Sequence, residues 1–447
     1  MSNNYAFINC NLIDGNLNSN AKNDMIMLIE NTNNNGVNKG SISKIGRKNE
    51  VKIPDNFTII DINHKYIMPG LINAHVHLFS NGSPWKANNT DKSRISIIEK
   101  LKNRRKKNSA LLSKRDNVLN ALNSGVTTVR CLGDQQYDDI TLRNEIDNNK
   151  YLGPRLIGSG AAICVTGGHG ASIISIISDS PWEGRKCVRQ NVTLGVDFIK
   201  ICITGGIVDA RKVGDAGRLE MTLEEVTAVC EEAHKIGLMV AAHVESTEGV
   251  RIALLGGVDT IEHGSEMDEE MIELFKNNPK TLRGYSSLIS TLYAVIPMHS
   301  LDTALTNVSE ISRKNASIVY NKMLRGVKQA INAGVKVGIG TDASLPYVTH
   351  YNTWRELDYL VKCADITHKQ AIYLATKSNA EILGIDNETG SLTVGKSADF
   401  IVLDENPLEN LRTLSNPNMV VCRGNIINNP KINKIENVDE ILDQIAL

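Results

Sequence analysis

The chain has 447 residues, of which 41% are hydrophobic and 22% are charged, a composition typical of a globular protein with a large core and more than one domain. Its 49 basic and 50 acidic side chains nearly cancel to a net charge of -1, and no long basic block occurs. This balance argues against nucleic acid or an anionic membrane as a partner, and it favours a small-molecule partner.

The eight cysteines are scattered without any Cys-x-x-Cys pair, and several lie inside apolar runs. They are typical of buried thiols in a reducing compartment. Residues 1–30 are polar and rich in asparagine, without the apolar core of a secretory signal, and no uncharged apolar run long enough to span a bilayer follows. We therefore expect a cytoplasmic protein that does not associate with membranes.

Both ends of the chain show a β pattern. Short apolar segments separated by clusters of Asn, Gly and Lys fill residues 1–67, and turn and strand signals return over residues 390–447. The predicted strands lie at 5–10, 25–29, 42–45, 58–62, 391–403, 419–422 and 425–427. We predict that the two terminal segments form one small β-sandwich domain, followed by a C-terminal tail.

Residues 68–389 alternate apolar strand-like runs with helical patterns, which indicates βαβ units and a parallel sheet with buried strands. The strand candidates are 71–77, 127–132, 155–158, 198–203, 239–243, 260–263, 282–287 and 335–341. Helices are expected between many of them, for example at 222–236, which opens with a capping box, and at 315–333. The economical fold is α/β, an eight-stranded (β/α)8 TIM barrel. The long connections 79–107 and 287–314 do not fit the alternation, and we predict that they are lids.

Two histidines mark the end of the first predicted barrel strand. His75 and His77 are separated by one residue, so on an extended strand both side chains lie on the same face and could hold one cation between them. A catalytic metal site needs about three protein ligands and an open position for water. The pair alone is equally compatible with the edge of a solvated strand, so further ligands must come from elsewhere.

More polar residues interrupt apolar runs at the predicted C-terminal ends of later strands, where barrel enzymes place their chemistry. They are Lys200, His243, His263 and Asp342. Any one of them alone is more often a satisfied strand-end residue than a ligand. Together with the two histidines they indicate a metal centre.

With these residues in place, the chain resembles the amidohydrolase superfamily, from the Pro-Gly-Leu-Ile-Asn-Ala-His-Val-His motif to the Gly-Lys-Ser-Ala-Asp-Phe-Ile-Val-Leu segment near the C-terminus. The resemblance implies a distorted barrel with one or two metal ions. By this resemblance one ion is bound by His75, His77 and Asp342, and the second by His243 and His263. Lys200 would bridge them as a carbamate formed with carbon dioxide, which requires a neutral amine.

The resemblance also implies a reaction. Two metal ions lower the pKa of a shared water and polarise a carbonyl, so that hydroxide attacks an acyl carbon. Asp342 is the expected general base and later the general acid. Oxygen and nitrogen ligands without thiolates suit zinc, and manganese, iron or cobalt also fit this set. The predicted cofactors are thus two divalent metal ions, zinc before the others, and the carbon dioxide of the carbamate.

A narrower resemblance, to the branch of Xaa-Pro dipeptidases, arginine or lysine carboxypeptidases and imidazolonepropionase-like amidohydrolases, rests on the Thr-Gly-Gly-His-Gly loop around His169 and on the Thr-Gly-Gly after Lys200. By this resemblance His169 would help at the reacting carbonyl, although such a loop can also be only a tight turn. His350, just beyond Asp342, is a second candidate substrate contact.

Glu245 departs from the pattern of that branch. Proline-releasing members carry at this position a tyrosine that binds the substrate carboxylate. An anionic side chain would instead favour a cationic or hydrogen-donating group, unless it pairs with a nearby arginine or lysine and never meets the substrate. Dipeptidase activity is therefore one option among several.

We predict a metal-dependent amidohydrolase that cleaves an amide-type C–N bond of a peptide, an acyl-amino acid, a cyclic amide or a urea at a binuclear site. The alternative is a mononuclear deaminase or an imidazolonepropionase-like ring hydrolase, which usually lacks the bridging lysine. A third interpretation, a barrel that has lost catalysis and serves as a binding subunit, is disfavoured because every ligand is present. Association into a homo-oligomer is left open.

Overall fold

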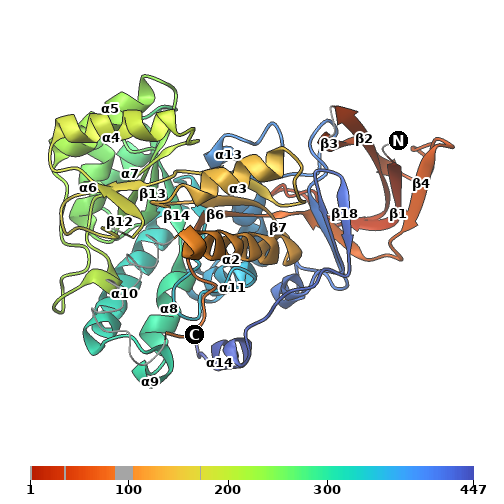
Figure 1. Cartoon of the computed structure of the whole chain (residues 1–447). Helices are drawn as coiled ribbons and strands as arrows, with labels where there is room; N and C mark the ends of the chain where they lie inside the picture. Colours follow the sequence, from red (N-terminus) through yellow and green to blue (C-terminus); the bar gives the residue numbers. More distant parts are fainter. Residues whose placement is uncertain (1–2, 35–36, 86–103, 172) are drawn as a thin grey trace.

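The computed structural model describes residues 3–34, 37–85, 104–171 and 173–447. In these residues the strands from both chain ends lie on one side of the molecule, and an α/β region that holds the parallel sheets lies on the other (Figure 1). The predicted α/β fold is confirmed at this level. The C-terminal helix α14 (Val438–Asp443) returns to the α/β region, where Arg355 Nη2 donates to the Asp443 carboxylate at 2.7 Å.

The strands of the two chain ends share one mixed sheet, in the order β18-β17-β16-β5-β1-β2-β3, with β4 paired to β1. They are β1 (Asn4–Leu12), β2 (Lys22–Asn34), β3 (Val37–Arg47), β4 (Phe57–Asp61), β5 (Tyr66–Pro69), β16 (Phe400–Leu403), β17 (Met419–Cys422) and β18 (Asn425–Asn428). The two parts meet where β5 runs antiparallel to β16, with Met68 opposite Ile401. The Phe7 and Phe400 rings pack edge to face, with centroids 5.0 Å apart. Both ends of the chain therefore build one β unit.

Two parallel sheets form the α/β region, one in the order β6-β7-β8 and the other in the order β10-β9-β11-β12-β13-β14-β15. Their strands are β6 (Leu71–Val76), β7 (Val126–Cys131), β8 (Arg155–Gly158), β9 (Ala162–Cys164), β10 (Ser175–Ile177), β11 (Ile199–Cys202), β12 (Val240–Val244), β13 (Thr260–His263), β14 (Ser287–Ser290) and β15 (Val337–Ile339). Each predicted run except 282–287 coincides closely with one of these strands. The short strands β9 and β10 have no counterpart in the sequence prediction.

The chain after β15 is joined to the end of β6 through the backbone. The N–H groups of Thr341 and Asp342 donate to the carbonyl of His75 at 3.0 and 2.8 Å, and Val76 bridges Ala343 in parallel. Asp342 has a φ of 55°, in the left-handed region that residues other than glycine rarely adopt. These contacts bring residues from distant parts of the sequence to one point.

The predicted strand at 282–287 begins later, as β14, because the preceding residues form a turn. In this turn the N–H of Asn278 donates to the carbonyl of Gly284, whose φ is 80°. The predicted lid at 287–314 is also wrong, since α8 (Leu292–Ser300), buried from Leu292 to Met298, and α9 (Thr303–Thr306) form this connection. The other predicted lid, 79–107, lies largely outside the described residues.

Helices flank the parallel sheets along the chain (Figure 1). Besides α8 and α9, they are α2 (Arg104–Asn123), α3 (Asp138–Asp147), α4 (Pro181–Thr193), α5 (Leu223–His234), α6 (Thr247–Gly256), α7 (Glu269–Lys276), α10 (Glu310–Asn332), α11 (Thr353–Ala364), α12 (His368–Tyr373) and α13 (Asn379–Leu383). The capping box of α5 is confirmed, because Thr222 Oγ1 accepts from the N–H of Glu225 and the Glu225 side chain accepts from the N–H of Thr222. Helix α10 begins before residue 315 because Ser309 caps it.

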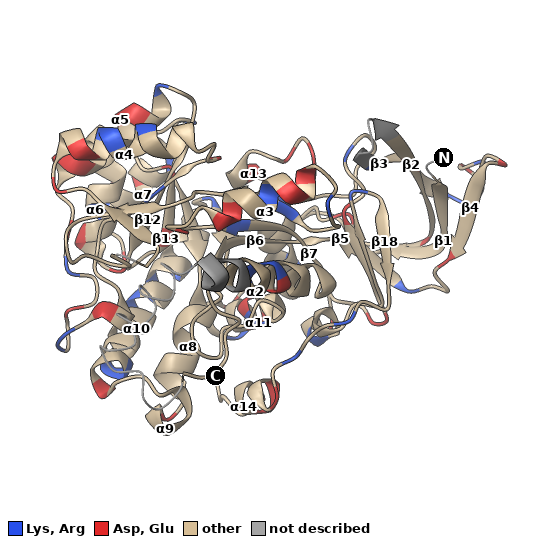
Figure 2. Ribbon diagram, viewed as in Figure 1, with Lys and Arg blue, Asp and Glu red and all other residues tan. Residues whose placement is uncertain are grey.

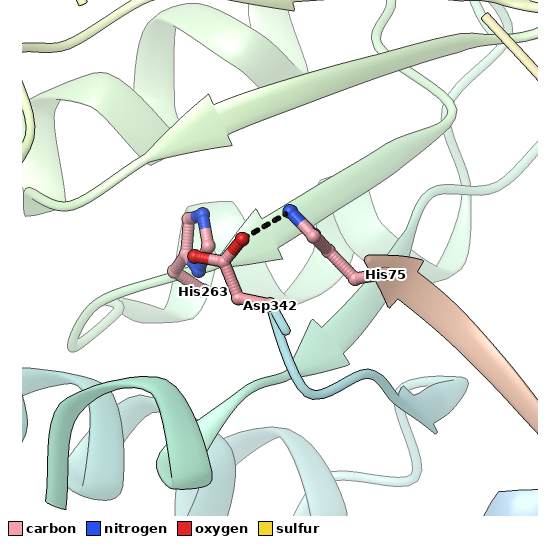
Figure 3. A group of neighbouring side chains, drawn as sticks. All are labelled: His75, His263 and Asp342. Atoms are coloured by element: carbon pink, nitrogen blue, oxygen red, sulfur yellow. Dashed lines mark ion pairs between the residues drawn. The ribbon is translucent and has the colours of Figure 1, made fainter. Parts of the chain in front are cut away.

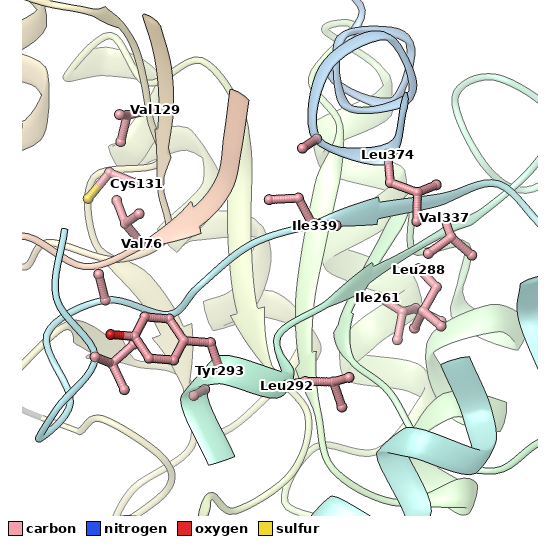
Figure 4. Close-up of a cluster of buried hydrophobic side chains, with 14 of the residues drawn as sticks. Val76, Val129, Cys131, Ile261, Leu288, Leu292, Tyr293, Val337, Ile339 and Leu374 are labelled. Carbon is pink, nitrogen blue, oxygen red and sulfur yellow. The ribbon is translucent and has the colours of Figure 1, made fainter. Parts of the chain in front are cut away.

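Apolar side chains of the parallel strands fill the space between the strands and their helices. Figure 4 shows this core, with Val76 and Val129 from β6 and β7 and with Leu288 and Ile339 from β14 and β15. All eight cysteines are free thiols, and all but Cys363 are buried, as the sequence predicts. Charged side chains buried beside this core, such as Arg130 and Glu262, therefore need polar partners.

Charged side chains of both signs are interspersed on the outer helices, for example on α4 and α5 (Figure 2). Arg185 of α4 contacts both Glu231 and Glu232 of α5, at 2.6 and 3.3 Å.

Among the residues that the structure describes, no helix is long and apolar enough to cross a membrane.

Candidate metal centre and active site

The end of β6 and the loop that follows β15 bring two imidazoles to one carboxylate, that of Asp342. Asp342 Oδ1 lies 3.3 Å from His75 Nε2 and 3.2 Å from His77 Nε2, yet it has no hydrogen-bond partner among the described residues. Burial alone would raise the pKa of Asp342, but His75 and His77 hold it well below its usual range. Two imidazole nitrogens and an ionised oxygen at this distance, without a hydrogen bond, fit a shared cation.

His263, at the end of β13, completes a second grouping. One ligand atom each of His75, His263 and Asp342 lie within 4.8 Å of one another, and Figure 3 shows the three side chains pointing toward a common centre. His243, at the end of β12, lies against His263, with ring centroids 4.6 Å apart. Its buried Nε2 has no hydrogen-bond partner in the described part of the chain. The compact triad thus joins residues that the resemblance assigned to two different ions.

Burial disfavours the charged form of three imidazoles of the site. It holds the pKa of His243 and of His263 well below the usual value, and it lowers the pKa of His77 as well. Neutral imidazoles are the form that binds a metal ion. The donor set includes two buried atoms without a hydrogen-bond partner in the described residues, Asp342 Oδ1 and His243 Nε2. It therefore suits one or two divalent cations.

Lys200 lies on β11 opposite Ala241 of β12 and is buried. Burial lowers the pKa of its ammonium, although the Glu262 and Asp342 carboxylates oppose this. Burial thus makes the neutral amine that carbamate formation needs more accessible than it is in water. Lys200, His243 and His263 therefore come from three adjacent strands.

Glu262 is a functional residue that sequence reasoning missed. Its Oε2 accepts from His75 Nδ1 at 2.8 Å, and its Oε1 accepts from Arg130 Nη2 at 2.7 Å, with all three side chains buried. Burial would raise the pKa of Glu262, but Arg130 and His75 lower it to about 2. This carboxylate fixes the tautomer of His75, so that Nε2 faces Asp342. The Thr291 hydroxyl, 2.7 Å from Nδ1, orients the ring of His263.

The backbone of β13 explains why the sequence pattern did not indicate Glu262 as a site residue. Neighbouring residues of a regular strand point to opposite faces, so Glu262 and His263 are not expected to serve one site. His263 has a φ of 69°, which ends the regular alternation and lets both side chains reach the ring of His75. The signal in the sequence was the acid itself, because a carboxylate inside a buried strand needs a partner.

A cavity of about 1420 Å³ opens above these ligands. His77, His243, His263 and Asp342 lie on its wall. Apolar side chains, among them Trp85, Val295, Met298 and Leu345, share the wall with charged ones, among them Lys114 and Asp134. Such a mixed wall suits a small organic molecule with both apolar and polar parts.

The structure brings His169 and Glu245 to the same cavity. His169 Nδ1 lies 2.5 Å from Asp209 Oδ2, and although burial disfavours the charged ring, this carboxylate raises the pKa of His169. Glu245 is buried, and its Oε2 has no hydrogen-bond partner in the described residues. Burial raises the pKa of Glu245 to about 8, which His169 opposes. In the described residues Glu245 makes no ion pair with arginine or lysine, the alternative that the sequence left open.

His350 is placed differently. It is not among the described residues that line the cavity, and its Nε2 lies 2.9 Å from the carbonyl oxygen of Ser80. Burial lowers the pKa of His350 to about 4, so the ring is neutral at physiological pH. This contact indicates that His350 supports the loop after β6, because its Nε2 is already occupied by a backbone carbonyl.

Comparisons with known proteins agree with this site. The amidohydrolase family model matches residues 66–427. An ochratoxinase from Aspergillus niger is 28% identical over 326 residues, which cover 67% of this chain and 64% of the ochratoxinase, so the chain spans less than two thirds of that relative. A 5-methylthioadenosine/S-adenosylhomocysteine deaminase from Carboxydothermus hydrogenoformans is 24% identical over 420 residues, or 86% of each chain.

Two solved structures are similar over nearly the whole chain. A candidate prolidase from Bifidobacterium longum is 39% identical with a TM-score of 0.86, covering 99% of this chain and 98% of the other. A Xaa-Pro dipeptidase with methionine bound in its active site is 29% identical with a TM-score of 0.80, covering 95% and 100%. The predicted resemblance is confirmed. The chain belongs to the amidohydrolase family, a family of hydrolases that act on carbon–nitrogen bonds.

Proposed function

We propose that this protein hydrolyses an amide-type C–N bond of a small molecule at a divalent metal centre. The observation that carries the proposal is the contact of one Asp342 oxygen with the Nε2 atoms of His75 and His77, at 3.3 and 3.2 Å, on the wall of a large cavity. The similarity to a candidate prolidase and to an ochratoxinase supports an amide-type substrate. The geometry therefore favours hydrolysis over a purely structural role.

The ligands of a binuclear site would be His75, His77, His243, His263 and Asp342, with Lys200 between the ions as a carbamate. When bound, divalent ions lower the pKa of water and polarise a substrate carbonyl. Zinc is the expected metal, and manganese, iron or cobalt would suit the same donors. Support comes from the burial of Lys200 and from the neutral state that burial favours.

The side chains of this chain would divide the remaining work. Asp342 accepts the proton of the attacking water and delivers it to the leaving nitrogen. His169, whose ring stacks on that of His243, donates a hydrogen bond to the developing oxyanion. Glu245, with its orphaned oxygen in the cavity, accepts from an N–H or ammonium group of the substrate.

The proposal extends to the fold and setting of the protein. The two parallel sheets would be parts of one distorted (β/α)8 barrel over residues 68–389, and the mixed sheet would be the β-sandwich of residues 1–67 and 390–447. The backbone bonds from residues 341–343 to the end of β6 support closure at that side. A cytoplasmic location, a small-molecule partner and association into a homo-oligomer stay predictions.

The test is a screen of metal-loaded protein against dipeptides, N-acyl amino acids, cyclic amides and ureas, with the metal content measured by elemental analysis. We expect turnover of one class, loss of turnover after chelation, and close to two ions per chain. The Lys200→Ala variant should hold less metal and lose activity. One ion per chain, together with full activity of Lys200→Ala, would remove the binuclear mechanism.

A second candidate is a mononuclear deaminase or ring hydrolase, which the similarity to a deaminase over 86% of the chain favours. Release of ammonia from adenosine-type nucleosides, measured in the same screen, separates this reaction from amide hydrolysis. Glu245→Gln tests the substrate contact in either case: above about pH 8, where Glu245 is ionised, it should raise the KM of cationic substrates more than that of neutral ones.

A further inference from the structure

His169 is held by two carboxylates that come from one segment of the chain. Residues 204–220 leave the end of β11 and return beside it, where the N–H of Gly205 donates to the carbonyl of Arg218 at 2.9 Å. From this segment Asp209 contacts the imidazole at Nδ1, at 2.5 Å, and Glu220 accepts from the backbone N–H of His169 at 2.8 Å. The side chain and the backbone of His169 therefore have separate carboxylate partners.

The ring of His169 has little room to move. One face stacks on His243, with centroids 4.0 Å apart and planes at 10°. A Cβ added to Gly206 would lie 2.4 Å from Nδ1 and Cε1 of His169, so only glycine lets the segment approach this closely. Arg218 Nη2 donates to Glu220 at 2.9 Å and so holds that carboxylate in turn. The segment therefore restrains His169 in three ways. Asp209 contacts the edge of the ring, Glu220 contacts the backbone N–H, and Gly206 packs beside the ring.

This arrangement assigns different tasks to the two ring nitrogens. Nδ1 faces Asp209, so Nε2 is the nitrogen left for a ligand in the cavity that His169 lines. We infer that Asp209 is the positioning residue of His169, which holds the tautomer and ring orientation in which Nε2 meets the substrate. The inference rests on the proposed function, in which His169 acts on the reacting group. Asp209 acts through the imidazole, as a carboxylate behind a metal-bound histidine does.

The kinetic test compares Asp209→Ala with a matched control, Asp179→Ala. Asp179 accepts from the N–H and the hydroxyl of Thr166, at 2.7 and 2.6 Å, and so anchors the loop of His169 without touching its ring. We expect Asp209→Ala to lower kcat about 10- to 100-fold with little change in KM, and Asp179→Ala to change kcat less than about twofold. Asp209→Asn, which keeps the shape and one acceptor oxygen, should fall between wild type and Asp209→Ala. Equal losses in Asp209→Ala and Asp179→Ala would overturn the inference.

A double-mutant cycle tests whether Asp209 acts through His169. In a His169→Gln background, Asp209→Ala should cost less than about a further twofold, because the imidazole that it positions is absent. A loss as large as in the wild-type background would mean that Asp209 acts elsewhere. Metal content, measured on every variant, should stay at the wild-type value, since neither residue belongs to the proposed ligand set.

A spectroscopic readout is independent of turnover. In protein labelled with ¹⁵N-histidine, the His169 Nδ1 proton should give a hydrogen-bonded downfield resonance, identified by its loss in His169→Gln. Asp209→Ala should abolish this resonance, and Asp179→Ala should keep it. Its absence from wild type would overturn the inference whatever the activity. A protein that shows the resonance but hydrolyses no amide would contradict the proposed function and leave the positioning contact established.

Discussion

The strand ends and the loops around the cavity hold their functional side chains by different means. His75, His263 and Asp342 sit on or next to buried parallel strands, and a buried carboxylate with its arginine lies directly behind His75. His169 belongs to a loop and depends on side chains of a second loop. The difference indicates that the ligand set is built into the core of the fold, whereas the substrate-facing wall depends on loops that can vary separately.

The largest effect is expected at Asp342, which joins both regions because it is a proposed metal ligand and also lines the cavity. Asp342→Asn keeps the size of the side chain but removes the proton acceptor, so kcat should fall about 100- to 10,000-fold. The remaining histidines should still hold metal. Steady-state kinetics beside elemental analysis check this prediction, and an active Asp342→Asn enzyme would exclude Asp342 as the base.

A second prediction concerns the buried carboxylate behind the strand-end ligands. Glu262→Gln leaves the charge of Arg130 buried without its partner, which should cost about 3 to 5 kcal/mol of unfolding free energy. It should also weaken metal binding about 10- to 100-fold. Urea unfolding of metal-free protein and metal titration are the measurements.

The matched control for Glu262→Gln removes both charges. Arg130→Met combined with Glu262→Gln should be less destabilised than Glu262→Gln alone, because no uncompensated charge stays in the core. Metal binding should remain weak in the double variant, because His75 still lacks the anionic carboxylate as its acceptor. Equal stability of the single and double variants would show that the pair contributes no more than its packing.

The pH dependence of stability tests the contribution of the Glu262 carboxylate in a second way. The folded pKa of Glu262 is about 2, below its usual value of 4.5, so its contribution to stability is present above pH 4.5 and is lost as the pH falls toward 2. We expect the unfolding free energy of the metal-free wild type to fall over this window. The double variant without Glu262 and Arg130 should lack this component, and an unchanged acid profile would argue against the depressed pKa.

The smallest effect is expected at His350, because its ring is held by the Ser80 carbonyl and it is not among the described residues that line the cavity. His350→Gln should change kcat/KM less than about threefold, and loss of the hydrogen bond should cost about 1 kcal/mol of stability. Activity assays and thermal unfolding test this. A large rise in KM at unchanged stability would instead place His350 at the substrate.

The two regions also differ in how far the sequence predicts them. His75, His77, His243, His263 and Asp342 could be found because each polar residue interrupts an apolar run at the end of a predicted strand, and a parallel arrangement brings such ends to one side. The approximate strands, the capping box of α5 and the shared β unit of the two chain ends follow from the same local patterns. These features depend on residue order and periodicity alone.

Tertiary structure decided which groups orient the site residues, because such contacts depend on which side chains meet across the fold. The carboxylate behind His75 stands next to His263 in sequence and reaches the site through a left-handed residue that no periodicity reveals. Asp209 becomes the partner of His169 only because two loops approach over a glycine, and His350 leaves the site because a backbone carbonyl takes its nitrogen. The sequence by itself therefore determined which residues can bind a cation, and the folded chain decided which groups orient them, since orientation depends on contacts between distant segments.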